Sequence, residues 1–131
     1  MQEPSNFGRL IDRVTPSRSD DLKIELLDSP QGARLIRLSG PLILRTLFEF
    51  QDGARKEAEK PVIIDLTEVP YMDSAGLGAV ISIFASCQRT NRGFAILGVS
   101  QRIRTLFEVT HCDGLLPTFN SLDAADASIS R

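Results

Sequence analysis

The sequence contains few of the residues on which metal centres and histidine-dependent catalysis depend. It has one histidine, His111, and two cysteines far apart, Cys87 and Cys112, so no ligand spacing typical of a metal site is present. No run of ~18 apolar residues occurs, so a membrane-spanning helix is not expected. The net charge of -2 gives no electrostatic case for binding nucleic acid or an acidic membrane surface.

The cysteine content also indicates a compartment. The first residues lack the basic start and apolar core of a secretory signal peptide. Two distant cysteines do not make a disulfide framework. We therefore expect free thiols in a chain that resides in the reducing cytoplasm and carries no cofactor.

The 131 residues are 42% hydrophobic and 24% charged, which is ordinary for one soluble globular domain. Residues 1–20 mix proline and serine with balanced charges and show no sustained period, so we expect a loosely attached tail. Residues 21–131 then form the domain.

Hydrophobic periodicity predicts an alternating series of strands and helices. We expect strands at 22–26, 35–38, 62–66, 94–99 and 115–119, and helices over 44–59, 74–91, from 100 and from 121. The first two strands are expected to pair as a hairpin, and the later ones to pair in parallel through right-handed crossovers. The pattern places Phe48 on the buried side of the first helix and Val109 on that of the third. The fold class is α/β.

The stretch from Val62 to Gly78, VIIDLTEVPYMDSAGLG, places Ser74 between a buried strand and a helix. A hydrolase nucleophile at this turn needs glycine two residues earlier, where this chain has Met72. Its base would have to be His111, which we interpret as a helix-end histidine near Asp113. Hydrolysis is therefore the weakest of the alternatives.

The glycines after Ser74 invite a comparison with nucleotide-binding loops. Gly76 and Gly78 open a helix after a strand, but a dinucleotide fingerprint needs a small residue at Ile81. We interpret both glycines as positions that let the start of the helix pack tightly.

Charge is distributed unevenly around this stretch. The acids Asp65, Glu68 and Asp73, with Glu57 and Glu59 upstream, favour a solvated acidic loop over acid–base chemistry. From Ser74 to Phe107 only cations occur. These charged residues are Arg89, Arg92, Arg102 and Arg104. They indicate either a solvated face or a surface that contacts a partner or a phosphate.

A serine or aspartate at a helix start usually caps the helix, and capping is the simplest role for Ser74. The predicted outer face of that helix, however, is built from small residues: Gly78, Ala79, Ser82 and Ser86. A surface of this kind lets another protein approach closely. Phosphorylation of Ser74 at its edge would add about -1.5 to -2 charges and oppose an acidic or apolar partner.

The segment VIIDLTEVPYMDSAGLGAVISIF also resembles the central signature of the STAS domain. This family includes bacterial anti-sigma factor antagonists and cytoplasmic domains of sulfate transporters. The resemblance extends from about Leu22 to Ile129. It implies a mixed sheet of four to five strands with about four helices mainly on one face, and no enzymatic activity.

For antagonists of this kind, the resemblance implies that a partner anti-sigma factor, itself a serine kinase, phosphorylates the serine after the aspartate. The unphosphorylated form binds that partner and releases a sigma factor, and a serine phosphatase restores it. Carried over, Ser74 is the phosphorylated residue. The partner-binding residues would be Asp73, Ser74, Ala75, Gly76, Leu77, Gly78 and Ser82.

Two departures from the family pattern and two alternatives accompany this hypothesis. Ala75 replaces a second hydroxyl found in many members, which leaves Ser74 as the acceptor. Ile43 replaces a polar residue, which puts the contacts of its loop in question. The alternative function is a STAS subunit of a lipid-transport or stress-signalling assembly, in which Ser74 only caps. A weak homodimer also stays open.

Overall fold

The computed structural model describes residues 21–56 and 59–129. Its elements run in the predicted order: β1 (Lys23–Asp28), β2 (Arg34–Ser39), α2 (Leu47–Arg55), β3 (Val62–Glu68), α3 (Ser74–Arg89), β4 (Phe94–Leu97), α4 (Gln101–Val109), β5 (Thr118–Phe119) and α5 (Leu122–Ile129). The predicted N-terminal tail lies outside the described residues.

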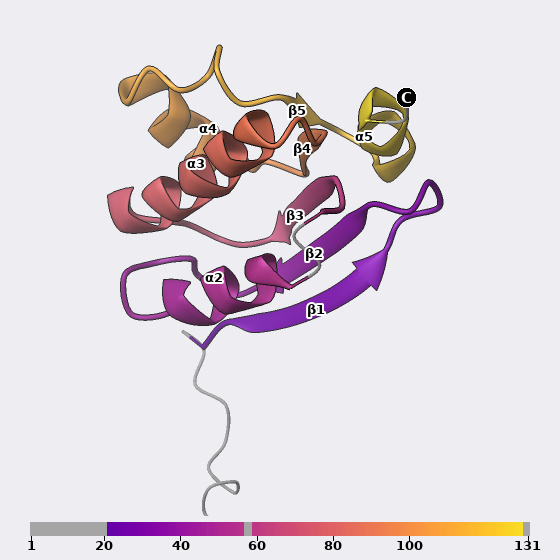
Figure 1. Cartoon of the computed structure of the whole chain (residues 1–131). Helices are drawn as coiled ribbons and strands as arrows, with labels where there is room; N and C mark the ends of the chain where they lie inside the picture. Colours follow the sequence, from indigo (N-terminus) through magenta and orange to yellow (C-terminus); the bar gives the residue numbers. More distant parts are fainter. Residues whose placement is uncertain (1–20, 57–58, 130–131) are drawn as a thin grey trace, which may run out of the picture.

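The five strands form one mixed sheet in sequential order (Figure 1). β1 and β2 pair antiparallel as the predicted hairpin, and β2 to β5 are parallel neighbours. Since each parallel pair needs a crossover, α2, α3 and α4 fill the connections and their N-termini all follow the carboxyl ends of strands. The loop that carries Ser74 therefore lies at the carboxyl edge of the sheet.

The helices cover the two faces of the sheet unequally. The larger core lies under α2, α3 and α4 and includes Phe50, Ile64, Val80 and Phe107. A smaller core on the opposite face packs Ile63 and its neighbours against α5, which Figure 1 shows on the other side of the sheet. The prediction of helices mainly on one face is confirmed.

A buried polar network ties α5 to the β1–β2 hairpin. The Ser29 hydroxyl donates to Asp126 Oδ1 at 2.6 Å, and the Gln31 N–H donates to Asp126 Oδ2 at 3.0 Å. The Ser29 oxygen in turn accepts from the Ala33 N–H at 2.9 Å. Because both side chains are buried and hydrogen-bonded, they link the two ends of the domain without an unsatisfied polar group.

Several predicted boundaries and orientations differ from the structure. α2 begins at Leu47 rather than at 44, and β4 and β5 are shorter than expected. Phe48 and Val109 were predicted to be buried but are 62% and 67% exposed. In α2 the inward stripe is Leu47 and Phe50, and Phe48 lies about 100° away from Leu47 around the helix.

Asp65 is not part of a solvated acidic loop, contrary to the prediction. It lies in β3, is buried, and accepts hydrogen bonds from Arg37 Nε at 3.2 Å and from the Thr67 hydroxyl at 2.6 Å. The register between β2 and β3 shifts just beyond it. The carboxylate therefore supports an irregularity of the strand next to the Ser74 loop.

Candidate functional site

The start of α3 is set by Asp73 rather than by Ser74. Asp73 is the N-cap: its backbone is extended, and its Oδ1 accepts from the Gly76 N–H at 2.8 Å. Ser74 is the first helical residue and is exposed. Its hydroxyl neither donates a hydrogen bond to, nor accepts one from, any residue in the described part of the chain. The hypothesis that Ser74 caps the helix is therefore wrong, and its hydroxyl faces solvent.

The loop after β2 holds this helix start in place. Leu42 forms an isolated parallel bridge with Met72, in which the Leu42 N–H donates to the Tyr71 carbonyl at 3.2 Å. The Asp73 N–H donates to the Leu42 carbonyl at 3.3 Å. The second oxygen of Asp73 accepts from the Leu44 N–H at 3.1 Å. Two loops are thus joined at Ser74.

The two glycines of the motif have different roles. Gly76 is buried, and a Cβ there would overlap the backbone carbonyl of Leu42. Gly78 is exposed, and a Cβ there would meet no atom within 4 Å. The prediction of tight packing holds for Gly76 and is wrong for Gly78, which instead lowers the outer surface of α3.

The accessible part of the predicted partner surface is narrower than expected. Asp73, Ser74, Gly78 and Ser82 are exposed, and Ala75 is half-buried. Leu77 is only 4% exposed and packs in the core, and Gly76 is buried as well. Neither residue is therefore accessible to a partner. Ala79, predicted on the outer face, is 3% exposed because it faces α2.

Two exposed apolar residues, one in the loop after β2 and one in the first turn of α2, were not predicted as site residues. Leu44 and Phe48 are 61% and 62% exposed, and Leu44 is the residue whose N–H binds Asp73. Leu44 therefore lies at the Ser74 loop, and Phe48 lies one helical turn further along the chain, in the first turn of α2. Their spacing of four residues could have indicated a second apolar stripe, separate from the Leu47–Phe50 stripe.

Three of the four arginines between Ser74 and Phe107 in the sequence lie in two separate places. Arg102, in the first turn of α4, stacks its guanidinium over the Tyr71 ring at 4.8 Å from the centroid. This contact brings a cation to the loop that precedes Asp73. Arg89 and Arg92 lie at the other end of α3 and line a groove against α2.

The arrangement around Ser74 does not assemble a hydrolase. α3 and α4 both follow parallel strands, so Ser74 begins one helix at the carboxyl edge and His111 follows the end of the other. Among residues 21–56 and 59–129, no three His, Cys, Asp or Glu side chains gather as a metal site. No helix within these ranges is long and apolar enough to cross a bilayer. Cys87 and Cys112 are buried, free thiols.

Comparison with known proteins accounts for this geometry. The model of the STAS domain matches residues 26–125, which include the whole Ser74 loop and all but the ends of the fold. The chain belongs to the STAS family. Its curated relatives are anti-sigma-B factor antagonists: that of Staphylococcus epidermidis is 32% identical over 84 residues, spanning 62% of this STAS chain and 78% of the relative. That of Staphylococcus aureus is 31% identical over the same length.

Solved structures confirm the fold of this STAS domain. An anti-sigma factor antagonist from Mycobacterium paratuberculosis superimposes with a TM-score of 0.77 at 19% identity, covering 88% of this chain and 100% of that one. The Bacillus cell fate determinant SpoIIAA in its phosphorylated form gives a TM-score of 0.63 at 17% identity, covering 80% and 98%. The family match and the staphylococcal relatives together make the chain a STAS protein of the anti-sigma factor antagonist family.

Proposed function

We propose that this protein is a phosphorylation-controlled anti-sigma factor antagonist that acts in the cytoplasm. In the unphosphorylated form it binds an anti-sigma factor that is also a serine kinase, and a sigma factor is released for transcription. The kinase transfers the γ-phosphoryl group of ATP to Ser74 Oγ, with loss of the hydroxyl proton and release of ADP. A serine phosphatase hydrolyses the phosphoserine and restores binding.

The observation that carries this proposal is that Asp73, and not Ser74, caps the N-terminus of α3. Because Asp73 caps α3, the Ser74 hydroxyl is exposed and is not committed to a described backbone group. A phosphoserine at the first helical position lies at the positive end of the helix dipole, so the helix tolerates it. The exposed apolar side chain of Leu44, whose N–H binds the adjacent Asp73, offers a contact that a new charge would disfavour.

The test uses each kinase of the anti-sigma factor type that the source organism encodes, purified and incubated with ATP and the full chain. We expect one member to label the wild-type chain on Ser74, as located by mass spectrometry. Ser74→Ala should abolish this labelling, and Ser82→Ala, an exposed serine two turns along the same helix, should keep it. Labelling of Ser74→Ala at the wild-type level, or no labelling by any member, would contradict the proposal.

Binding of the same kinase provides an independent measure. Ser74→Asp or Ser74→Glu should weaken the affinity by at least about 1–3 kcal/mol, the range for an unfavourable buried charge or a lost polar pairing. Calorimetry with the unlabelled chain and with both variants measures this. Equal affinities would indicate a STAS subunit that binds constitutively, as in a lipid-transport or stress-signalling assembly.

A further inference from the structure

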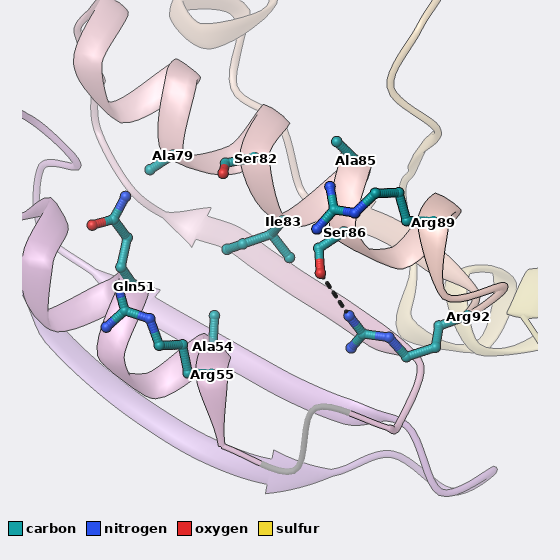
Figure 2. Close-up of a pocket in the computed structure, with 10 residues that line it drawn as sticks. All are labelled: Gln51, Ala54, Arg55, Ala79, Ser82, Ile83, Ala85, Ser86, Arg89 and Arg92. Atoms are coloured by element: carbon teal, nitrogen blue, oxygen red, sulfur yellow. Dashed lines mark hydrogen bonds between the residues drawn. The ribbon is translucent and has the colours of Figure 1, made fainter.

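A groove of about 330 Å³ separates α2 from α3 and is drawn in Figure 2. Small and apolar side chains line it from both helices, including Ala54, Ala79 and Ile83. Three arginines complete the lining, and no aspartate or glutamate among the described residues takes part. The groove therefore combines an apolar lining with a cationic rim.

The three rim arginines differ in how they are held. Arg92 donates to the Lys60 carbonyl at 3.1 Å and to the Ser86 hydroxyl at 3.1 Å, which orders the turn after α3. Arg55 pairs with Asp52 at 2.7 Å. Arg89 is exposed and forms no salt bridge with any described residue.

Two of these cations converge on one point of the groove. Figure 2 shows the guanidinium groups of Arg89 and Arg92 extending toward Ser86 from opposite sides. Guanidinium groups arranged in this way match the oxygens of a carboxylate through charge-assisted hydrogen bonds. Within the described residues, no carboxylate lies within salt-bridge distance of either group. An anion carried by a partner would complement this rim.

The groove continues the surface that begins at Ser74. Ser74, Gly78 and Ser82 are exposed at four-residue spacing, and the next turn carries Ser86 and then Arg89. With a rise of 1.5 Å per residue, Ser74 and Arg89 lie about 22 Å apart along α3. One protein partner with an interface of about 800 Å² per side spans such a distance.

We propose that the partner that docks at Ser74 also places an acidic segment in the groove between α2 and α3. Its carboxylates bind Arg89 and Arg92, and its aliphatic stems pack on the half-buried Ala54 and Ile83. This inference rests on the proposed function and adds the chemistry of the partner: an acidic patch about four helical turns from its catalytic centre.

The test is made on the kinase that labels Ser74. At low ionic strength, Arg89→Glu should raise the Kd for that kinase by about an order of magnitude or more. Most of the difference should disappear at high salt, since a rim charge acts through a screened field. Arg89 is the residue to change because Arg92 also supports the fold. Circular dichroism and the urea midpoint verify that the variant is folded.

A charge-matched pair serves as the control. Arg89→Gln and Gln88→Glu each lower the net charge by one on the same turn of α3, but Gln88 does not line the groove. Only Arg89→Gln should weaken binding. A kinase that labels the wild type but binds Arg89→Glu with unchanged Kd overturns the groove proposal alone, whereas absence of any labelling overturns both proposals. Inorganic phosphate is titrated into the wild type and Arg89→Glu as a second control. Phosphate binding that is lost in Arg89→Glu while its kinase affinity is unchanged would also overturn the groove proposal, in favour of a small-anion site.

Discussion

The carboxylate of Asp73 accepts a hydrogen bond from the backbone N–H of Leu44, 29 residues earlier in the chain. Its other oxygen caps α3 through the Gly76 N–H. One side chain thus joins the loop after β2 to the loop after β3 and fixes Ser74 between them. The exposed serine is held on a supported backbone, although its own hydroxyl supports nothing in the described structure.

Removal of this carboxylate should lower stability. We expect Asp73→Ala to cost about 1–2 kcal/mol in the free energy of unfolding, because two backbone N–H groups lose their acceptor. Asp73→Asn keeps one amide oxygen for two donors and should lie between Asp73→Ala and wild type. Urea unfolding measures both. Asp113→Ala, which removes an exposed carboxylate from a loop, is the control and should change little; equal midpoints for all three variants would refute the double role of Asp73.

The motif glycines provide a second prediction. Gly76→Ala should destabilise the protein by about 2 kcal/mol or more, because the new methyl group overlaps the Leu42 carbonyl and the helix start must shift. Gly78→Ala places the same methyl group in open space and should stabilise the helix by about 0.5–1 kcal/mol. Thermal and urea unfolding of the two variants give the comparison. Similar effects at both positions would contradict the structure of this loop.

The order of elements and the sheet pairing could be predicted from the sequence, because the apolar periods at Ile24, Leu38, Ile64 and Ile96 are strong and the turns between them are clear. Element ends could not, because they depend on contacts between distant segments. For example, the bridge between Leu42 and Met72 joins the loops that follow β2 and β3, beyond the ends of both strands.

The sequence placed Ser74 correctly between β3 and α3, but the orientation of several neighbouring side chains was not predicted. A helical wheel places Ala79 beside Ser82, and only the approach of α2 decides that Ala79 is buried. The role of Gly76 likewise depends on the Leu42 carbonyl, which comes from the distant loop after β2. Phe48 is apolar by type, but only the Leu47 and Phe50 side of α2 is buried, and Phe48 lies about 100° around the helix from Leu47.

The buried thiols lead to a prediction about pH. Burial raises the pKa of the Cys87 thiol above its ordinary value of 9.0, and the positive charge of Arg92 partly offsets this rise. The folded state therefore favours the protonated thiol, and this contribution to stability is present below pH 9.0 and is lost as pH rises past it.

Thiol titration with Ellman's reagent tests the thiol assignment. At mildly alkaline pH the native chain should react slowly at both cysteines, and both should react rapidly in guanidinium chloride. In Cys112→Ser the remaining slow phase of the thiol reaction reports Cys87 alone. The urea concentration at the unfolding midpoint of this variant should decrease as the pH is raised above 9.0. Rapid labelling of the folded Cys112→Ser protein at neutral pH would show that Cys87 is accessible.

The exposed ring of Phe48, in the first turn of α2 after the loop that binds Asp73, supports a prediction that separates recognition from stability. Phe48→Ser should leave the free energy of unfolding within about 0.5 kcal/mol of wild type, since the ring is 62% exposed. It should raise the KM for phosphorylation of Ser74 several-fold, because an aromatic anchor at an interface is replaced by a small polar group.

Val109→Ser is the matched control: it changes an equally exposed apolar side chain, 67% exposed at the end of α4, and should leave KM unchanged. A several-fold rise in both variants would indicate a general effect of surface hydrophobicity. A KM unchanged in Phe48→Ser would exclude Phe48 from the surface that the kinase recognises.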